Sequence, residues 1–541
     1  MASKRRQRTP KGRRPKTERA AKQTAERVSE LAPARPVLWI PLALAIGLVL
    51  LSYVSRVQQS PTLVRSFWAA AAVLAVWQAT LSLRLRGESA RRFLRVELRP
   101  QHYLQATVQV AVLAYWGYYW RPVYEYAWLL VAQLVFAYAF DMLLSWSRRD
   151  TYVLGFGPFP IIFSTNLFLW FRDDWYYLQF VMIAVGFMGK EFVRWEREGR
   201  RVHIFNPSAF SLALFSIILI ATTTSDLTWG HEIATTLTLA PHIYLFLFLL
   251  GLVVMYAFSI TLIAGSAAIV LFAASATYAA ATGVPYFIDS EIPAAVFLGL
   301  HLLVTDPSTS PRTPPGKVVF GALYGLGVFV LYALLGAAGV PTFYDKLLCV
   351  PLLNLSVRWI DRLVGSSGAG VQWKPARANL AAMAVWVVFF GVMAALGATD
   401  ATHRGDKIPF WERACAEGRR NACQVLVQIE SSYCGDNSGW ACNELGRHAM
   451  DGKIVVADSE RALSYFSRAC EARFQAGCVN LLAPDELERA NPRALDLRLL
   501  LREGGANLTE MPEPELYARA CDHGWTFACE NAQVNESGGG S

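Results

Sequence analysis

The sequence predicts an all-α membrane protein: a polytopic helix bundle followed by a soluble helical domain with disulfide bonds. Of its 541 residues, 54% are hydrophobic and 17% are charged, whereas an average soluble domain has about 25% charged residues. Apolar stretches near the ~20 residues needed to cross a bilayer follow one another from residue 37 to residue 397. Eight of the nine cysteines lie after residue 400. A cytosolic enzyme, a disordered chain and a fibrous protein are therefore excluded.

Residues 1–36 form a basic tail. They contain twelve Lys or Arg, three acidic residues and no aromatic residue, so they cannot bury enough apolar surface to fold alone. The other basic residues lie mainly in short loops between apolar runs, so we interpret the net charge of +9 as a topology signal and expect no nucleic-acid partner for the protein. We expect a disordered cytoplasmic tail. Contact with anionic lipid or nucleic acid is the alternative for this segment alone.

Thirteen apolar stretches predict about thirteen membrane spans. The stretches are 37–55, 66–84, 103–120, 126–146, 153–171, 175–195, 207–224, 240–262, 264–283, 290–304, 318–338, 345–362 and 378–397. The predicted parts of the chain are the tail 1–36, two extra spans with a basic segment 37–100, a core 101–365, a final span 366–398, a soluble domain 399–535 and a linker remnant 536–541.

Loop charges predict the orientation. Clusters of basic residues follow the even-numbered spans, whereas odd-numbered spans end in acidic or neutral sequence such as Ser225-Asp226. Because positively charged loops stay in the cytoplasm, the N-terminus is predicted to be cytoplasmic. Thirteen spans would place the C-terminal domain in the periplasm, with the chain in the bacterial inner membrane. The basic clusters are Arg84, Arg86, Arg91, Arg92, Arg95 and Arg99; Arg148 and Arg149; Arg194, Arg197, Arg200 and Arg201; Arg312 and Lys317; and Arg358, Arg362, Lys374 and Arg377.

The cysteines predict four disulfides in the C-terminal domain. Four pairs are each eight residues apart, namely Cys415–Cys423, Cys434–Cys442, Cys470–Cys478 and Cys521–Cys529. This spacing fits the end of one helix, a short turn and the start of an antiparallel helix, where two Cβ atoms reach disulfide distance. Metal binding is the alternative, but paired metal ligands usually lie two to four residues apart, so no metal is expected. Disulfides need an oxidising compartment, in agreement with the loop charges.

The sequence around these cysteines repeats. Similar segments precede three of the first cysteines, namely Glu412-Arg413-Ala414-Cys415, Ser467-Arg468-Ala469-Cys470 and Tyr517-Ala518-Arg519-Ala520-Cys521. Residues 410–531 thereby resemble Sel1-like repeats of the cysteine-rich, Hcp-like kind. The resemblance implies an α-solenoid of stacked helix pairs with a concave protein-binding surface. It therefore implies that the domain binds a periplasmic partner protein rather than catalysing a reaction.

Polar residues at membrane depth are costly and mark candidate sites. Asn206 is placed to cap a helix whose first residue is Pro207, and free N–H groups there could alternatively hold an anionic ligand. Thr305 and Asp306, followed by prolines, break a helix where irregular backbone is tolerated only in protein or along a polar cavity. Lys190, near the end of a span, either extends to the interface or faces a ligand.

These segments resemble the NqrB/RnfD family of membrane electron-transport subunits and its UnbU-like relatives. The resemblance covers about 95–365 and rests on Thr165-Asn166-Leu167, Gly189-Lys190, the segment from His203 to Pro207 and the segment from Thr305 to Pro311. It implies a core of two inverted repeats with flavin near the repeat interface, and other subunits of a larger membrane complex as partners. It also implies that the cofactor lies near Lys190, Asn206, Pro207, Thr305 and Asp306.

The flavin-attachment motif of that family is altered in this chain. The family carries Ser-Gly-Ala-Thr-x-Leu, whose Thr is esterified to FMN, whereas this chain has Glu232-Ile233-Ala234-Thr235-Thr236-Leu237. Thr235 is the one residue onto which covalent attachment carries over. Because Ile233 and the Glu232 carboxylate should hinder a tight turn and an approaching phosphate, we expect noncovalent FMN or riboflavin in preference to covalent flavin. Quinone is the other candidate ligand.

Two functions follow from these observations. The first is a subunit of a multi-subunit electron-transport complex, which relays electrons through bound flavin or quinone while its periplasmic repeats dock a partner. The alternative is a non-redox membrane scaffold whose periplasmic repeats assemble a protein complex. The retained segments at Asn206-Pro207 and Asp306 favour the first function, and the altered flavin motif favours the second.

Overall fold

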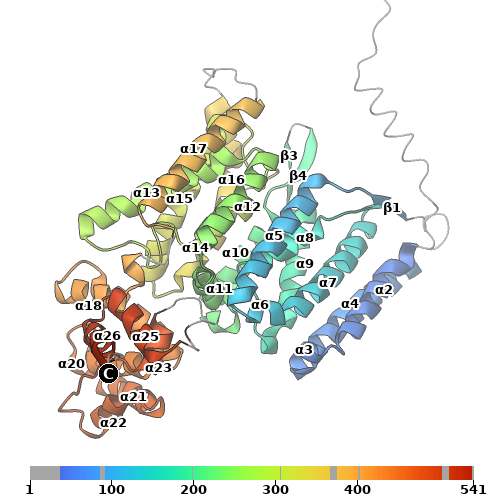
Figure 1. Ribbon diagram of the computed structural model, residues 1–541. Coiled ribbons are helices and arrows are strands. Elements are labelled where there is room, and N and C mark those ends of the chain that lie inside the picture. Colours follow the sequence, from blue (N-terminus) through green and yellow to red (C-terminus); the bar gives the residue numbers. More distant parts are fainter. Residues whose placement is uncertain are drawn as a thin grey trace, which may run out of the picture.

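Helices dominate the structure. The computed structural model describes residues 37–85, 92–197, 199–304, 306–365, 375–399, 403–501, 508 and 511–538. Figure 1 shows a long bundle of helices with a smaller helical domain at one end. Within these ranges the β structure amounts to four short strands and one isolated bridge. The helical character of the chain and its disulfide bonds are confirmed.

An N-terminal helical unit precedes the core of the bundle. Its elements are η1 (Val37–Trp39), α2 (Ile40–Leu51), α3 (Ser55–Gln58) and α4 (Pro61–Arg84). The hydroxyl of Ser60 accepts a hydrogen bond from the Leu63 N–H and thereby caps α4. Both α2 and α4 pack on α7 of the core, so the two extra predicted spans are joined to it.

The core consists of two five-helix groups. The first group is α5 (Pro100–Tyr119), α7 (Ala127–Trp146), α8 (Pro158–Asn166), α9 (Tyr177–Phe192) and α10 (Pro207–Ala221), with α6 (Pro122–Glu125) and η3 (Asp173–Trp175) between them. The second group is α12 (Ile243–Phe258), α13 (Thr261–Thr282), α14 (Ala294–Leu302), α15 (Pro314–Ala337) and α16 (Asp345–Gly365). Linking elements are η4 (Ser225–Leu227), α11 (Gly230–Thr236), η5 (Leu237–Leu239) and η6 (Thr342–Tyr344), and α17 (Pro375–Ala395) follows.

The two groups repeat one pattern of contacts. In each group the third helix has nine residues. In each group the first helix contacts the third, the second contacts the third and fourth, and the fourth contacts the fifth. Between the groups, α5 packs against α12 and α10 packs against α16. Corresponding helices therefore meet at the junction of the groups.

The two groups also run in opposite directions. Gly157 and Pro160, at the start of α8, line the same cavity as Asp306, which follows the end of α14. The aromatic ring of Phe168, which follows the end of α8, approaches Gly299 within α14. The nine-residue helices α8 and α14 are therefore antiparallel, as are the groups to which they belong.

The prediction of thirteen membrane spans is not supported. By length and apolar composition, five helices in the described ranges could cross a bilayer, or six if the bent pair Gly230–Leu239 and Ile243–Phe258 is one span. The five are Pro61–Arg84, Ala127–Trp146, Thr261–Thr282, Pro314–Ala337 and Arg377–Ala395. Of the other predicted stretches, two form helices of 20 and 21 residues, α5 and α16, that are not apolar enough to be counted, and the rest form shorter helices. At about 1.5 Å per residue, the nine-residue α8 and α14 cover less than half of a hydrocarbon layer of about 30 Å.

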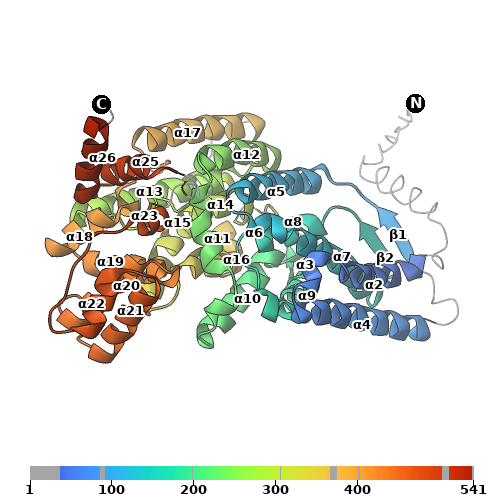
Figure 2. The same ribbon diagram turned by 60° about the horizontal axis from the view of Figure 1, so that its bottom comes forward.

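The strands lie at one end of the bundle. β1 (Phe93–Val96) pairs in parallel with β2 (Thr151–Leu154), and β3 (Arg194–Arg197) pairs antiparallel with β4 (Arg200–His203). Ion pairs join the loops at this end: Glu191 binds Arg148, Arg149 and Arg194, and Arg197 binds Asp361. We call this end the strand face, and the opposite end, which carries the C-terminal domain (Figures 1 and 2), the domain face. Several of the predicted cytoplasmic arginine clusters thus gather on one face.

The C-terminal domain consists of helix pairs joined by disulfides. Its elements are η7 (Arg404–Asp406), α18 (Ile408–Ala416), α19 (Ala422–Gly435), α20 (Gly439–Asp451), α21 (Ser459–Glu471), α22 (Gln475–Leu482), α23 (Ala494–Leu500), α25 (Glu513–Asp522) and α26 (Thr526–Gly538). All four disulfides join the cysteines that the spacing predicted. Each disulfide connects the end of one helix to the start of the next. Because α26 runs to Gly538, it includes three residues of the segment interpreted as a linker remnant.

The first and last parts of the C-terminal domain are in contact. The Lys407 ammonium donates a hydrogen bond to the Asp522 carbonyl, so the start of the domain touches its last helix pair. Trp440 of α20 and Trp525, between α25 and α26, meet edge to face with ring centroids 5.2 Å apart. One hydrophobic core extends from Ile408 to Ala528. The helix pairs of the C-terminal domain therefore form a compact unit.

The domain is fixed to the bundle along the segment that follows α13. The Arg419 guanidinium donates to the Gly283 carbonyl at 2.9 Å, and the Asn421 amide donates to the Tyr278 hydroxyl at 3.2 Å. His403 contacts the Ile288 carbonyl through Nδ1 at 3.1 Å. Val284 belongs to the hydrophobic core of the domain. These contacts place α19 over the domain face of the bundle.

A buried ion pair makes the stability of the C-terminal domain depend on pH. The Glu430 carboxylate in α19 lies 3.1 Å from Nε2 of His448 in α20. Burial raises the pKa of Glu430 to about 7. Burial lowers the pKa of His448, but the hydrogen bond and charge of Glu430 outweigh this effect and raise it above its ordinary value. Glu412, Glu444, Arg447 and Arg489 are the other charged groups around the pair.

We expect the free energy of unfolding of this domain to fall as the pH rises from about 4.5, the ordinary pKa of Glu430, through its folded pKa of about 7. Both folded pKa values are raised, so the folded state binds more protons than the unfolded state, with a slope of up to about 1.4 kcal/mol per pH unit for each proton. The measurement is amide hydrogen exchange of α19 and α20 in the full chain, corrected for the intrinsic rate. Glu430→Gln should remove most of the dependence of the unfolding free energy on pH, and the surface control Glu417→Gln should retain it. An unchanged slope in Glu430→Gln would contradict this assignment.

Candidate functional site

A cavity at the strand face brings together four of the six predicted site residues. Its volume is about 680 Å³, within the range of about 300–1,000 Å³ for ligand sites. It lies at the junction of the two helix groups, because its walls come from α5, α8, α9 and α10 of the first group and from α12 and the loop after α14 of the second. Lys190, Asn206, Pro207 and Asp306 line it. Thr305 lies outside the described residues.

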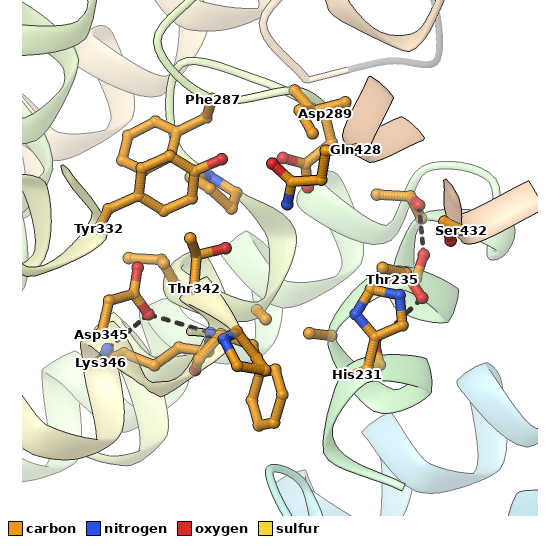
Figure 3. A pocket seen from close by; sticks show the side chains of 18 of the residues that line it. His231, Thr235, Phe287, Asp289, Tyr332, Thr342, Asp345, Lys346, Gln428 and Ser432 are labelled. Atoms are coloured by element: carbon orange, nitrogen blue, oxygen red, sulfur yellow. Dashed lines mark hydrogen bonds and ion pairs between the residues drawn. The ribbon is translucent and has the colours of Figure 1, made fainter. Parts of the chain in front are cut away.

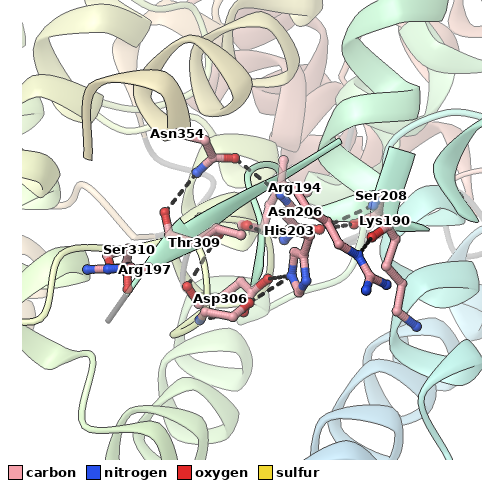
Figure 4. A network of polar contacts seen from close by, with 12 residues as sticks. Lys190, Arg194, Arg197, His203, Asn206, Ser208, Asp306, Thr309, Ser310 and Asn354 are labelled. Carbon is pink, nitrogen blue, oxygen red and sulfur yellow. Dashed lines mark hydrogen bonds and ion pairs between the residues drawn. The ribbon is translucent and has the colours of Figure 1, made fainter. Parts of the chain in front are cut away.

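Asn206 has a structural role. Its side-chain oxygen accepts hydrogen bonds from the Ser208 N–H at 3.2 Å and hydroxyl at 2.8 Å, which caps α10. Its side-chain amide donates to the Leu303 carbonyl at 3.0 Å, and its backbone N–H donates to Asn354 of α16. Asn354 in turn donates to the Thr309 carbonyl at 3.1 Å. Asn206 and Asn354 therefore join α10, α16 and the loop after α14, as Figure 4 shows.

Asp306 and His203 form a polar pair at the cavity wall. The Asp306 carboxylate accepts hydrogen bonds from the Ser308 N–H at 2.9 Å and hydroxyl at 2.6 Å. Nε2 of His203 lies 3.5 Å from the Asp306 carboxylate and 2.8 Å from the Ser308 hydroxyl oxygen. The short turn from Asp306 to Ser308 thus holds the carboxylate against the imidazole. Such a pair can take up and release a proton beside a bound ligand.

The remaining cavity wall includes two cationic side chains, Lys190 and Arg99, together with the imidazole of His102. Lys190 stands on the opposite side of His203 from Asp306 (Figure 4), and Arg99 and His102 of the α5 entrance also line the cavity. Among the described residues of the lining, Asp306 is the one carboxylate. The wall therefore suits an anionic or electron-rich ligand.

Sequence reasoning did not select His203, His102, Arg99 or Ser308 as site residues. His203 opens the His203-Ile204-Phe205-Asn206-Pro207 segment, so its place beside Asn206 was an available signal. Its contact with Ser308 spans 105 positions along the chain. A single sequence carries no signal for that contact, because the contact depends on how the two groups pack.

Asn166 contributes to the fold beside the cavity. Its side-chain amide donates to Gln133 of α7 at 2.6 Å, and its oxygen accepts from Gln133 at 3.2 Å and from Gln179 of α9 at 3.3 Å. All three side chains are fully buried. The closed amide network satisfies polar groups that would be costly in the membrane and joins α7, α8 and α9. In the segment Thr165-Asn166-Leu167, which contributes to the resemblance, Asn166 therefore has a structural role.

Thr235 lies at the opposite face of the bundle from the other predicted residues. It belongs to α11 and lines a separate cavity of about 140 Å³ between the bundle and the C-terminal domain (Figure 3). Its hydroxyl donates to the His231 carbonyl at 3.1 Å. The predicted flavin-attachment residue and the strand-face residues therefore do not form one site.

The residues around Thr235 differ in part from expectation. Ile233 is buried, so its bulk faces the core rather than the cavity. The Glu232 carboxylate is paired with the Arg172 guanidinium, which also lies 4.3 Å above the Trp229 ring. This pairing offsets the charge that was expected to repel a phosphate. The cavity itself, at about 140 Å³, is smaller than the usual ligand site, but Thr235 and Glu232 also line the adjoining cleft of about 650 Å³.

The domain-face cavity is covered by α19. Gln428, Ile429 and Ser432 of that helix line it, and the buried ion pair of Asp345 and Lys346 lies in its wall (Figure 3). A cleft of about 650 Å³ continues from it past Trp120 and Leu495. The C-terminal domain therefore helps to enclose space at the domain face.

Comparisons with known proteins add no relative. No family model matches the chain, and no curated protein or solved structure matches it. Within the described ranges no group of three or more His, Cys, Asp or Glu side chains is placed to hold a metal ion. The functional argument therefore rests on the geometry of the strand-face cavity.

Proposed function

We propose that the chain is a membrane electron-transfer subunit that binds flavin or quinone, without a covalent bond, in the strand-face cavity. The observation that carries the proposal is the meeting of Lys190, Asn206 and Asp306 with His203 around a ligand-sized cavity. Its position between two antiparallel helix groups is the position at which inverted-repeat membrane proteins bind ligands. The resemblance of 95–365 to NqrB/RnfD subunits points to the same ligand class.

The residues of the cavity fit this ligand class. A bound flavin or quinone would supply reversible one- and two-electron chemistry. Lys190 and Arg99 would bind a phosphate or the electron-rich edge of a ring. His203 would hold a proton at the imidazole, oriented by the Asp306 carboxylate, for a ligand whose basicity rises on reduction. Asn206 would act through the fold, because its polar groups are occupied by Ser208 and Leu303.

The orientation supports a cytoplasmic electron donor. Arginine-rich loops gather at the strand face, and such loops stay in the cytoplasm. The disulfide-bonded domain lies at the other face, and disulfides persist in oxidising compartments. We therefore place the cavity on the cytoplasmic side of a bacterial inner membrane, with the C-terminal domain in the periplasm, where it would dock a partner protein. Other membrane subunits would complete the complex.

The alternative is a non-redox scaffold that assembles proteins through the C-terminal domain. It is favoured by the hydrogen bonds of Asn206 and Asn354, which are satisfied within the protein. These bonds would maintain the Asn206-Pro207 segment for structural reasons alone. The two functions differ in whether the purified protein carries a redox ligand.

We expect detergent-purified protein to carry a flavin absorption band, or quinone in an organic extract. Acid precipitation should release the flavin to the supernatant, because Thr235 lies away from the cavity. Asp306→Asn combined with His203→Gln should lower ligand occupancy at least about tenfold, or about 1.4 kcal/mol. The control Asp361→Asn removes a carboxylate on the same face that pairs with Arg197 outside the cavity and should retain the ligand. A folded protein with neither ligand would favour the scaffold, and flavin in the acid pellet would assign Thr235 as an attachment site.

A further inference from the structure

We propose that the β1–β2 sheet docks an acidic, soluble protein that adds a strand to the open edge of β1. The sheet stands at the strand face and has two strands within the described ranges. Both strands have four residues, and they pair in parallel from Phe93–Thr151 to Val96–Leu154. The inference that this protein is a redox partner rests on the proposed function, whereas the docking itself does not.

A sheet of two short strands is smaller than the sheets that are stable on their own. Two strands alone are marginally stable in water, and parallel sheets are normally extended and covered on both faces. The N–H groups of Phe93 and Glu97 donate to Asp150 and Leu154 of the β2 segment. Because backbone groups alternate in direction along a strand, those of Leu94 and Val96 face the other edge. That edge offers donors and acceptors to an added strand.

The side chains around the edge of β1 indicate what kind of partner would bind there. Val96 and Leu98 are exposed by 61% and 62%, and Val153, which pairs with Arg95 and so lies on the opposite face of the sheet from Val96, is exposed by 46%. Each face of the sheet therefore carries some apolar contact area. The segments 92–99 and 148–154 contain five arginines and two carboxylates. Arg95 and Arg99 both pair with Glu97, and their side chains remain 41% and 57% exposed. Apolar contacts surrounded by arginines fit a protein surface with acidic residues.

Two other occupants fit these observations less well. Residues 1–36 of the chain carry twelve basic and three acidic residues, so the arginines would repel them. Lipid chains would cover Val96 and Leu98, but they cannot donate or accept hydrogen bonds at the strand edge. An acidic protein satisfies both the backbone groups and the charge.

The docking surface adjoins the strand-face cavity. Arg99, three residues after β1, and Gly157, three residues after β2, both line that cavity. Both strands of a parallel pair end at the same edge of the sheet, so their carboxyl ends point to the cavity entrance. A protein bound to β1 would therefore lie beside the entrance, which is where an electron donor must bind if the cavity holds the redox ligand.

The test uses the full-length protein in its native membrane, with a photoreactive amino acid at Val153. The control position is Val388 of α17, which is 67% exposed and should form lipid adducts. We expect Val153 to cross-link one soluble acidic protein, with the adduct mapped by mass spectrometry to a strand of that protein. The yield should fall at least about tenfold in Val96→Pro, which removes an outward N–H, and in the double variant Arg95→Glu with Arg99→Glu. Val96→Ala, which keeps the N–H, should cross-link as the wild type does.

The outcomes separate docking from the redox function. Adducts with lipid, with another segment of this chain or with a second copy would overturn the docking proposal, as would equal yields from Val96→Pro and Val96→Ala. The ligand of the same preparation is measured independently by absorption and extraction. Specific cross-links without a redox ligand would support docking and reject its electron-transfer role. A bound ligand without cross-links would reject docking alone.

Discussion

Reduction of the four disulfides is expected to unfold the C-terminal domain while the membrane bundle stays folded. Each disulfide closes a loop of eight residues, which is worth about 2.5 kcal/mol by the chain-entropy relation. Four such loops give about 10 kcal/mol, similar to the whole free energy of unfolding of an ordinary domain at about 5–15 kcal/mol. The bundle has no disulfide in the described ranges, and its single cysteine, Cys349, is buried.

The measurement is limited proteolysis in detergent before and after reduction, with thiol labelling to verify that all four bonds are open. We expect cleavage throughout 403–538 and protection of the core helices. Cys434 and Cys442 are both buried, whereas Cys521 and Cys529 are partly exposed. Serine replacement of the first pair should therefore lower the stability of the domain more than serine replacement of the second pair. Continued protection of the fully reduced domain would show that its hydrophobic core is sufficient without the bonds.

The disulfides could be predicted because they depend on local geometry alone. A spacing of eight residues specifies a helix end, a turn and a helix start, so each pair could be assigned without knowing the tertiary structure. The closure of the domain could not be predicted in this way. It depends on contacts such as that of Lys407 with Asp522, which are 115 positions apart.

The predicted number of spans is not supported, because hydropathy does not distinguish a long helix from a short helix followed by buried non-helical chain. The predicted stretch 153–171 contains α8, which ends at Asn166. Residues Leu167 to Phe171 continue as buried chain, exposed by no more than 2%. Their apolar character reflects burial among other helices, not contact with lipid.

The sequence could predict which kinds of residue line the candidate site, but it could predict only in part which of them come together in one cavity. Lys190, Asn206 and Asp306 were selected because polar groups are costly at membrane depth, and all three line the strand-face cavity. Thr235 was selected from the resemblance and lies at the other face. The antiparallel packing of the two groups determines which of these residues meet, and the order of residues along the chain does not contain that information.

Gly321→Ala is expected to disrupt the packing of α13 against α15, two helices in close contact. A Cβ atom at Gly321 would overlap the backbone carbonyl of Ile263 and the hydroxyl of Ser266, and one at Gly325 would overlap the Ala267 carbonyl. A backbone carbonyl cannot rotate away as a side chain can, so the helices would have to separate. Overpacking usually costs about 1–3 kcal/mol, and contact with backbone places this variant at about 3 kcal/mol, well above the gain in helix propensity of at most about 1 kcal/mol.

Gly265→Ala is the matched control, because Gly265 lies on α13 and no atom within 4 Å would meet its Cβ. It should leave stability unchanged or raise it by up to about 1 kcal/mol. The two variants are compared by heating them in detergent and measuring the fraction of protein that stays monodisperse at each temperature. Small residues let membrane helices approach closely, so Gly321→Ala should lower the apparent Tm and Gly265→Ala should not. Equal Tm values for the two variants would mean that α13 and α15 are farther apart than their contacts indicate.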